Sequence, residues 1–171
     1  SIPARYVGGF IADRIEIGFQ KGIRDALGEK IRRRIVEHLG IMVDGVKTVE
    51  VYTVDEGLSA DMLHEAAKGP LSDPIIQDFA VNSPLADRFD WLIEVGYRPG
   101  VTDNVGKTAR EAIGLLLGKR AADTPPVYTS RQYMIQGTME KHDAEMIATS
   151  LLANGLIERF IIISGRDWDR K

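Results

Sequence analysis

The chain has 171 residues, with 22 basic and 25 acidic side chains and a formal net charge of −3 at pH 7. A nucleic acid or an anionic membrane surface calls for a basic face on its partner, so this charge argues against both. The absence of cysteine excludes disulfides, a thiolate nucleophile and Cys-ligated metals. Because no stretch approaches the roughly 20 apolar residues of a membrane span, we expect a cytoplasmic protein.

The first half of the chain predicts five elements. In chain order they are a strand over 14–20, a helix with apolar positions at Leu27, Ile31, Ile35 and Leu39, a strand over 46–54, a helix over 60–68, and a strand over 75–81. Alternating or β-branched apolar residues indicate the strands, and apolar residues every four positions indicate the helix. Gly22 supplies a turn before the first helix, while Asp25 and Ser59 are placed to cap the two helices.

The second half predicts the same series of elements. They are a strand over 92–98, a helix with apolar positions at Val105, Ala109, Ile113 and Leu116 or Leu117, a strand over 127–135, a helix over 140–153 with apolar positions at Ala144, Ile147, Ala148, Leu151 and Leu152, and a strand over 156–163. Gly100 and Asp103 repeat the turn and the cap. Thr138 is the expected cap of the last helix, and Asn154 followed by glycine is expected to stop it in a left-handed conformation.

The two halves also match residue by residue. Residues 15–19, IEIGF, align with 93–97, IEVGY, at an offset of 78, and this offset holds as far as Gly40 and Gly118. Beyond a three-residue insertion near Pro125, the offset is 81 and pairs Tyr52 with Tyr133. We infer a tandem duplication of a strand–helix–strand–helix–strand unit, with an α+β fold and antiparallel sheets.

The duplication divides the chain into four segments. They are a first unit over 14–81, a linker over 82–90, a second unit over 91–163, and a charged tail or linker over 164–171. A unit of about 75 residues is marginally stable alone, so we expect the two to pack around a pseudo-two-fold axis, as a covalent form of a homodimer. Trp168, in the charged tail, either docks on a neighbouring surface or begins a linker to further protein.

A glycine-rich motif, G-x-x-D-x-x-G, precedes the first helix of each unit. Its residues are Gly22, Asp25 and Gly28 in the first unit and Gly100, Asp103 and Gly106 in the second. A glycine-rich strand-to-helix turn can bind phosphate, but an aspartate at the helix entrance repels an anion. We interpret the motif as structural: a tight turn, a cap, and a glycine that lets the helix pack closely.

No catalytic grouping emerges from the sequence. The three histidines, at 38, 64 and 142, are isolated from one another in spacing, and serine-nucleophile motifs are absent. We therefore expect no catalytic residue, metal site or bound cofactor in this chain. The strand over 127–135 carries Tyr128, Ser130, Arg131 and Tyr133, which form either a partner-binding surface or an ordinary half-buried strand.

The doubled motif, the Tyr-Met-Ile run at 133–135 and the run Leu-Leu-Ala-Asn-Gly-Leu-Ile-Glu at 151–158 resemble PurS, the small component of phosphoribosylformylglycinamidine (FGAM) synthase. The resemblance spans both units and is stronger in the second. The first departs at residues 70–74, Pro-Leu-Ser-Asp-Pro, so the role of Asn154 is expected to be confined to one copy.

The resemblance implies a ferredoxin-related fold and a non-catalytic role in de novo purine biosynthesis. It implies an adaptor that self-associates and bridges a PurL-like synthetase and a PurQ-like glutaminase, which together use ATP, Mg and glutamine. The chain is then either a separate tandem subunit or the N-terminal domain of a longer synthase. The alternative hypothesis is a ferredoxin-like regulatory module that binds a small metabolite, and a concave pocket between the two units would favour it.

Overall fold

Seven strands form one antiparallel sheet in a computed structural model that describes residues 6–7 and 10–168. The strands are β1 (Tyr6–Val7), β2 (Phe10–Phe19), β3 (Gly45–Asp55), β4 (Gln77–Val81), β5 (Trp91–Tyr97), β6 (Val127–Gln136) and β7 (Glu158–Ser164). Across the sheet β2, β3, β6, β5 and β7 follow one another, and both β1 and β4 pair with the outer side of β2. The architecture is therefore α+β, as predicted, with the strands of both halves joined into a single sheet.

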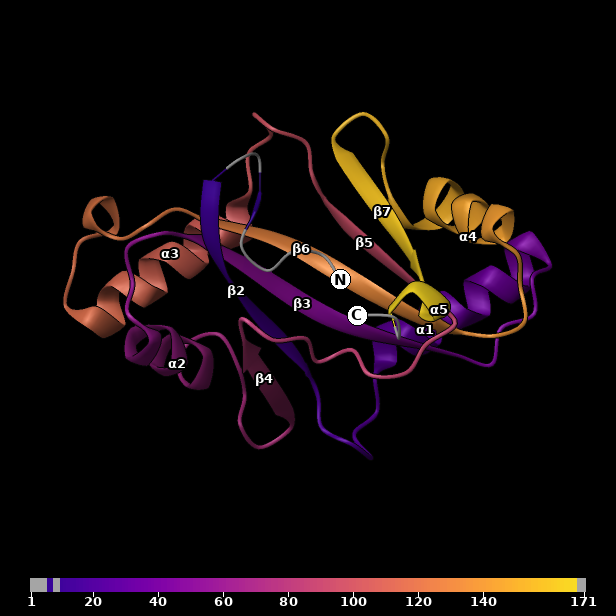
Figure 1. Ribbon diagram of the computed structural model, residues 1–171, viewed down its shortest axis with the longest axis horizontal. Coiled ribbons are helices and arrows are strands. Elements are labelled where there is room, and N and C mark those ends of the chain that lie inside the picture. Colours follow the sequence, from indigo (N-terminus) through magenta and orange to yellow (C-terminus); the bar gives the residue numbers. More distant parts are fainter. Residues whose placement is uncertain (1–5, 8–9, 169–171) are drawn as a thin grey trace.

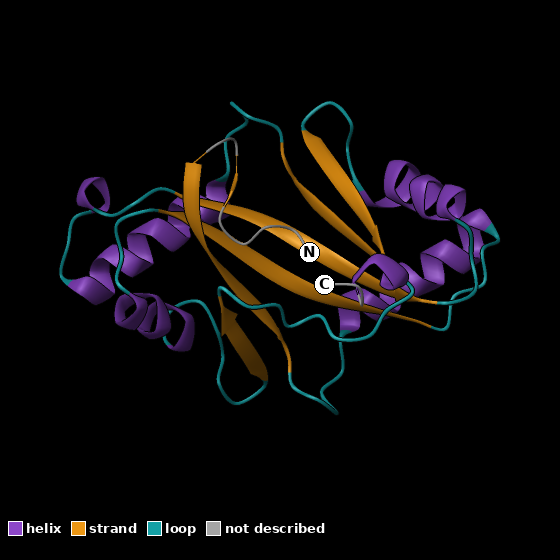
Figure 2. Cartoon of the chain, viewed as in Figure 1, coloured by secondary structure: helices purple, strands orange, loops and turns teal. Residues whose placement is uncertain are grey.

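The helices gather in two groups at opposite ends of the long strands β3 and β6 (Figures 1 and 2). They are α1 (Ala26–Arg34), continued by a π-helical turn (Ile35–Leu39), α2 (Ala60–Lys68), α3 (Asn104–Leu117), a 3-10 turn (Ala121–Asp123), α4 (Lys141–Ile147), continued by a π-helical turn (Ala148–Leu152), and α5 (Gly165–Trp168). One group combines α2 with α3 and the other combines α1 with α4 (Figure 1). Each group thus contains one helix from each half of the chain.

The pairing registers of the two halves coincide. β2 pairs with β3 through Ile15 opposite Tyr52, and β5 pairs with β6 through their counterparts at offsets of 78 and 81, Ile93 opposite Tyr133. The outer pairs β2–β4 and β5–β7 agree in the same way. Because a shift of one residue would turn every side chain to the other face, the shared register places counterpart residues in equivalent surroundings.

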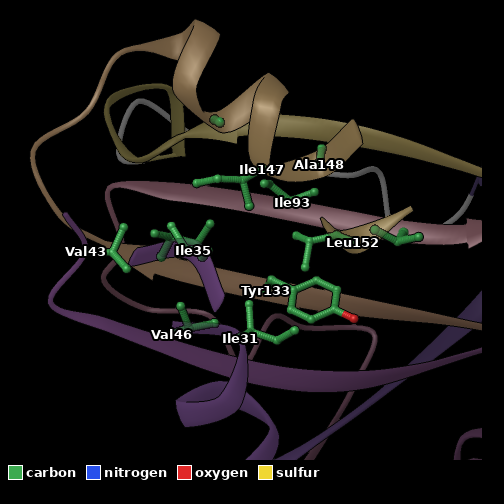
Figure 3. Close-up of a cluster of buried hydrophobic side chains, with 12 residues drawn as sticks. Ile31, Ile35, Val43, Val46, Ile93, Tyr133, Ile147, Ala148 and Leu152 are labelled. Atoms are coloured by element: carbon green, nitrogen blue, oxygen red, sulfur yellow. The ribbon is translucent and has the colours of Figure 1, made fainter. Parts of the chain in front are cut away.

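Two apolar cores lie between the sheet and the two helix groups, on the side that we call the helix face. The first contains Ile31 of α1, Ile35 of the following π-helical turn, Ile147 of α4, and strand residues such as Ile93 (Figure 3). The second joins residues of α2 and α3 to β2, β3 and β6 in the same manner. Since each core draws on helices from both halves, neither half buries its apolar residues without the other.

The opposite side of the sheet, which carries Arg14, Glu16, Val49 and Gln132, is covered by the linker; we call it the linker face. Its apolar residues form a third core with the linker residues Ala86 and Phe89. The linker is anchored at its start by Asn82, which accepts a hydrogen bond from Arg14 N and donates one to Asp13 Oδ1. The segment between the halves is therefore part of the folded core.

The C-terminal segment differs from the predicted charged tail. Ser164 ends β7, residues 165–168 form α5, and the Trp168 ring packs against Phe89 at a centroid distance of 5.3 Å. Gly165 is required at this point, because a Cβ there would overlap the carbonyl oxygen of Phe89. Of the two predicted roles for Trp168, docking on a neighbouring surface is the one observed. Residues 169–171 lie outside the described residues.

Several predicted boundaries and caps also differ. β2 begins at Phe10 rather than at residue 14, and α4 is capped by Glu140 rather than Thr138, in a reciprocal arrangement with Asp143. The Glu140 carboxylate bonds the backbone of the first turn while Asp143 bonds back to Glu140 N, so two free helix N–H groups are satisfied. Val105, expected in the core, is 57% exposed.

Candidate functional site

The four residues predicted to bind a partner do not share a surface. Tyr128 and Ser130 lie on the linker face of β6, whereas Arg131 and Tyr133 lie on the helix face. Tyr133 is only 6% exposed and belongs to the first core (Figure 3), while Tyr128 is 51% exposed. Successive side chains of a strand point to opposite faces, so these residues, adjacent in sequence, are separated by the sheet. Of the two interpretations of this strand, the ordinary half-buried strand agrees with the placement of the four side chains.

The first glycine–aspartate motif connects a helix to a strand. Asp25 accepts a hydrogen bond from Gly28 N at 2.8 Å as the N-cap of α1, and its other carboxylate oxygen accepts from both Thr48 N and Thr48 Oγ1 of β3. Gly22 has a φ of +86°, which favours glycine. A Cβ at Gly28 would overlap the carbonyl oxygen of Val46. Each motif residue thus has a structural task.

The second motif repeats these contacts. Asp103 caps α3 through Gly106 N at 2.8 Å and binds Thr129 N and Oγ1 of β6, and Gly100 has the same φ of +86°. A Cβ at Gly106 would overlap the carbonyl oxygen of Val127. In both motifs the aspartate carboxylate occupies the helix entrance where a phosphate would bind, which leaves no room for that function.

Asn154 does not stop α4 in a left-handed conformation: among the described residues other than glycine, only Asn82 has a positive φ. Instead, its side-chain Oδ1 accepts from Leu156 N and its carbonyl oxygen accepts from Glu158 N. The counterpart Asp73 makes the same two bonds, to Ile75 N and Gln77 N. The hydrogen bonds of this turn are therefore repeated in both copies, because a carboxylate oxygen replaces the amide oxygen as acceptor, and the expected asymmetry does not extend to them.

These two turns hold large apolar side chains in solvent. Ile75 is 81% exposed and its counterpart Leu156 is 88% exposed. Nearby on the adjoining strands, Phe19 and its counterpart Tyr97 are both 38% exposed. We call Phe19 with Ile75 the first corner, and Tyr97 with Leu156 the second corner. They lie at the outer ends of β2–β4 and β5–β7, on opposite sides of the molecule (Figure 1).

Both corners are held by hydrogen bonds from the backbone and from side chains. Gln20 N of the first corner donates to the Ile76 carbonyl, and the counterpart Arg98 N donates to that of Ile157. A side chain from the following strand caps each turn: Gln77 Oε1 accepts from Asp73 N, and Glu158 Oε1 from Asn154 N. Both halves thus hold an exposed aliphatic residue on a turn with the same hydrogen bonds.

A buried ionic cluster links the two halves on the linker face. The Arg14 guanidinium donates through Nε to Glu16 Oε2 at 2.9 Å. Its two terminal nitrogens each donate to one oxygen of the Glu94 carboxylate, which is a bidentate contact. Burial by itself lowers the pKa of Arg14, but the hydrogen bonds and charges of Glu94 and Glu16 outweigh it and raise the pKa above its usual value. Sequence reasoning missed this cluster, although Glu16 and Glu94 stand within the repeated IEIG and IEVG runs.

A second ion pair lies at the centre of the helix face, between the two helix groups. Arg131 Nε of β6 donates to Glu50 Oε1 of β3 at 2.6 Å, and both side chains are partly exposed, at 39% and 40%. Burial alone lowers the pKa of Arg131, yet the hydrogen bond to Glu50 and its charge raise it overall. Neither Glu50 nor its pairing with Arg131 had been singled out from the sequence.

A shallow hollow separates α2 from α3 at the junction of the halves. Its volume is about 320 Å³, its walls include Pro70 and Leu71 on one side and Val105 and Ala109 on the other, and Tyr52 also lines it. Burial, followed by the charge of Glu50, raises the pKa of Tyr52. In the other half the counterpart of Ala109 is Ile31, a core residue. The first half therefore has a larger side chain at the position where Ala109 lines the hollow.

The histidines are the remaining candidates for a functional role. His38, His64 and His142 are all exposed, and the described residues contain no group of three or more His, Asp or Glu side chains suited to a metal ion. No helix in the described part of the chain has the length and apolarity needed to cross a membrane. No family model matches the sequence, and no curated protein matches it.

Proposed function

We propose that the chain is a tandem pair of PurS-like units acting as a non-catalytic adaptor of FGAM synthase. In this role it bridges a PurL-like synthetase and a PurQ-like glutaminase in the cytoplasm, either as a separate subunit or as the N-terminal domain of a longer chain. ATP, Mg and glutamine are used by those partner components. The proposal rests on the sequence resemblance to PurS and on the features of the fold described below.

The observation that carries the proposal is the shared register of the two halves. Both outer and inner strand pairs are related by the same offsets of 78 and 81 that align the sequence. Both glycine–aspartate motifs and both turns at Asp73 and Asn154 repeat their hydrogen bonds. Such agreement supports descent of the halves from one unit and pairing about a pseudo-two-fold axis.

The two corners are the surfaces that we assign to bridging. An adaptor must hold two components at once, and the two corners lie on opposite sides of the molecule, so they form two separate surfaces (Figure 1). Each presents an aliphatic residue on a fixed turn, which lowers the entropy lost on association. We assign one component to the corner at Ile75 and the other to the corner at Leu156.

Pull-down with the synthetase and glutaminase components at micromolar concentration tests the adaptor role. We expect both to bind, Ile75→Ser to weaken the binding of one component, and Leu156→Ser to weaken that of the other, each by 10-fold or more, about 1.4 kcal/mol. Leu115→Ser is the matched control, because Leu115 is 84% exposed on α3, away from both corners. Failure of both components to bind the unaltered chain would contradict the proposal.

The hollow between α2 and α3 favours a second candidate, a metabolite-binding module, because its lining comes from both halves. Under this alternative, a metabolite screen finds a compound that raises the unfolding temperature further as its concentration increases. Ala109→Ile, which copies the counterpart Ile31, should fill the hollow and remove that effect. A screen without any such stabilisation would leave the adaptor as the better-supported function.

A further inference from the structure

An ion pair marks the centre of the sheet. In the β3–β6 pairing Glu50 stands opposite Arg131, and these two positions are counterparts at the offset of 81. On either side of this pair the ladder repeats itself in mirror order, with Thr48 opposite Tyr133 and Tyr52 opposite Thr129. The pseudo-two-fold axis of the proposed duplication therefore passes between Glu50 and Arg131, so each faces the residue that occupies its own place in the other unit.

Because of this position, the two charges that face each other depend on which units pair. If two first units paired through β3 in this register, Glu50 would face a second glutamate; two second units would place one Arg131 against another. Like charges directly opposite each other on neighbouring strands are destabilising, whereas the observed opposite charges attract. At 39% and 40% exposure, the two side chains are only partly screened by solvent.

The ionic cluster on the linker face acts against one of these wrong pairings, that of two second units; two first units would bring two Arg14 side chains together with two Glu16 side chains. Glu16 and Glu94 are counterparts, but the counterpart of Arg14 is the apolar Leu92. The Arg14 side chain, 8% exposed, binds a carboxylate from each unit. Two second units paired together would bury two glutamates without an arginine, and an unpaired buried charge is far costlier than a buried pair.

From these two sites we propose that the units recognise each other by charge: the surface of the first unit formed by Arg14 and Glu50 fits a unit that carries Glu94 and Arg131. The surface thus selects a second unit as its partner and disfavours a copy of itself. The inference rests on the duplicated architecture of the proposed function but not on its partner components. Pull-down results with the synthetase or glutaminase therefore leave it unaffected.

Charge reversal in the full chain tests the central pair. Arg131→Glu creates the glutamate pair of two first units, and Glu50→Arg the arginine pair of two second units. We expect each to lower the unfolding temperature by about 3 °C or more, and the double exchange to recover most of that loss. The exposed pair Arg120–Asp123 lies within one unit, and Arg120→Glu is the control, with little expected change. A double exchange no more stable than the single reversals would overturn the proposal.

A mixing experiment tests recognition itself. A Gly-Ser insertion of about 20 residues between Ser83 and Pro84, spanning roughly 25 Å, allows units of different chains to meet. With this insertion, the Glu50→Arg and Arg131→Glu chains are refolded together. We expect a dimer in which the first unit of each chain pairs with the second unit of the other, with the stability of the unaltered inserted chain. Only this exchange places opposite charges at positions 50 and 131 in both pairs of units. Exclusively monomeric product, as stable as either variant alone, would overturn the inference.

Discussion

Gln132 lies on the linker face beside Val49 and Glu94, and it is 1% exposed. Its Oε1 atom has no hydrogen-bond partner among the described residues. Its counterpart in the first unit is Val51, a fully buried apolar residue. A valine therefore fits the equivalent surroundings, and the amide brings a polar group whose burial is unfavourable unless it is hydrogen-bonded.

We accordingly expect Gln132→Val to raise the free energy of unfolding by about 1 kcal/mol, because the unpartnered amide is removed. Urea denaturation followed by circular dichroism measures the change. The reciprocal control, Val51→Gln, buries an amide at the counterpart position and should lower stability. A clear loss of stability in Gln132→Val would show instead that the amide has a stabilising partner.

Tyr52 predicts a pH dependence. Its pKa is raised above the usual value of 10.0 by burial and by the charge of Glu50. In the folded state the phenol therefore keeps its proton at pH values at which an exposed tyrosine would lose it. This contribution is fully present below pH 10 and is lost as the pH rises through the folded pKa, since the unfolded chain releases the proton first. The stability of the unaltered protein should therefore fall above pH 10, and the stability of Tyr52→Phe should fall less steeply. Parallel denaturation curves of the two proteins across pH 9–12 would contradict this.

At the scale of elements, the motif that begins α1 and α3 decides how each helix meets the sheet. One aspartate carboxylate caps the helix and holds the neighbouring strand through a threonine, as Asp25 does with Thr48. The second glycine of the motif lies against a strand carbonyl. The motif therefore sets both where the helix begins and how close it packs.

Gly28→Ala and Gly106→Ala should each lower the free energy of unfolding by about 1–3 kcal/mol, because the added methyl group would overlap a backbone oxygen that has little freedom to move. Thermal or urea unfolding gives the measurement. Gly45→Ala is the matched control: a Cβ there meets nothing within 4 Å, and its φ is not in the left-handed region. An equal loss of stability at all three glycines would show that contact with the backbone oxygen is not its cause, because Gly45 lacks such a contact.

At the scale of the whole molecule, the two halves depend on each other. Both cores on the helix face combine helices from both units, and Arg14 connects the units on the linker face. The linker covers that face through Ala86 and Phe89 and is bound by Glu16, whose Oε1 accepts from Leu85 N. We therefore expect one cooperative unfolding transition for the entire chain.

Arg14→Leu tests this connection, since leucine is the residue of the counterpart position 92. The substitution leaves Glu16 and Glu94 buried without their arginine, and we expect a loss of about 3–5 kcal/mol. Replacing both glutamates by glutamine in the same chain removes the buried charges and should restore part of the loss. If the triple variant is no more stable than Arg14→Leu, then packing of the arginine stem, rather than charge, is the main contribution.

The sequence by itself determined the order of the main elements and the offsets of 78 and 81 that relate the two halves. It also determined the capping roles of Asp25, Ser59 and Asp103. Periodicity and capping can be predicted because they depend on residues only a few positions apart. The sequence also indicated the apolar stripe of α4 and the π-helical turn that continues it, of which Ala144, Ile147 and Ala148 are fully buried.

Only the tertiary structure decided which surfaces exist. It separated Tyr128 from Tyr133, packed Trp168 against Phe89, and brought Arg14 to Glu94, 80 positions away. It also placed Glu50 opposite Arg131, which depends on the register between β3 and β6. These contacts join residues far apart in the chain, and local pattern does not encode which strands become neighbours or in what register. The sequence therefore predicted a repeated unit, whereas the way two such units meet was decided by the packing of the whole sheet.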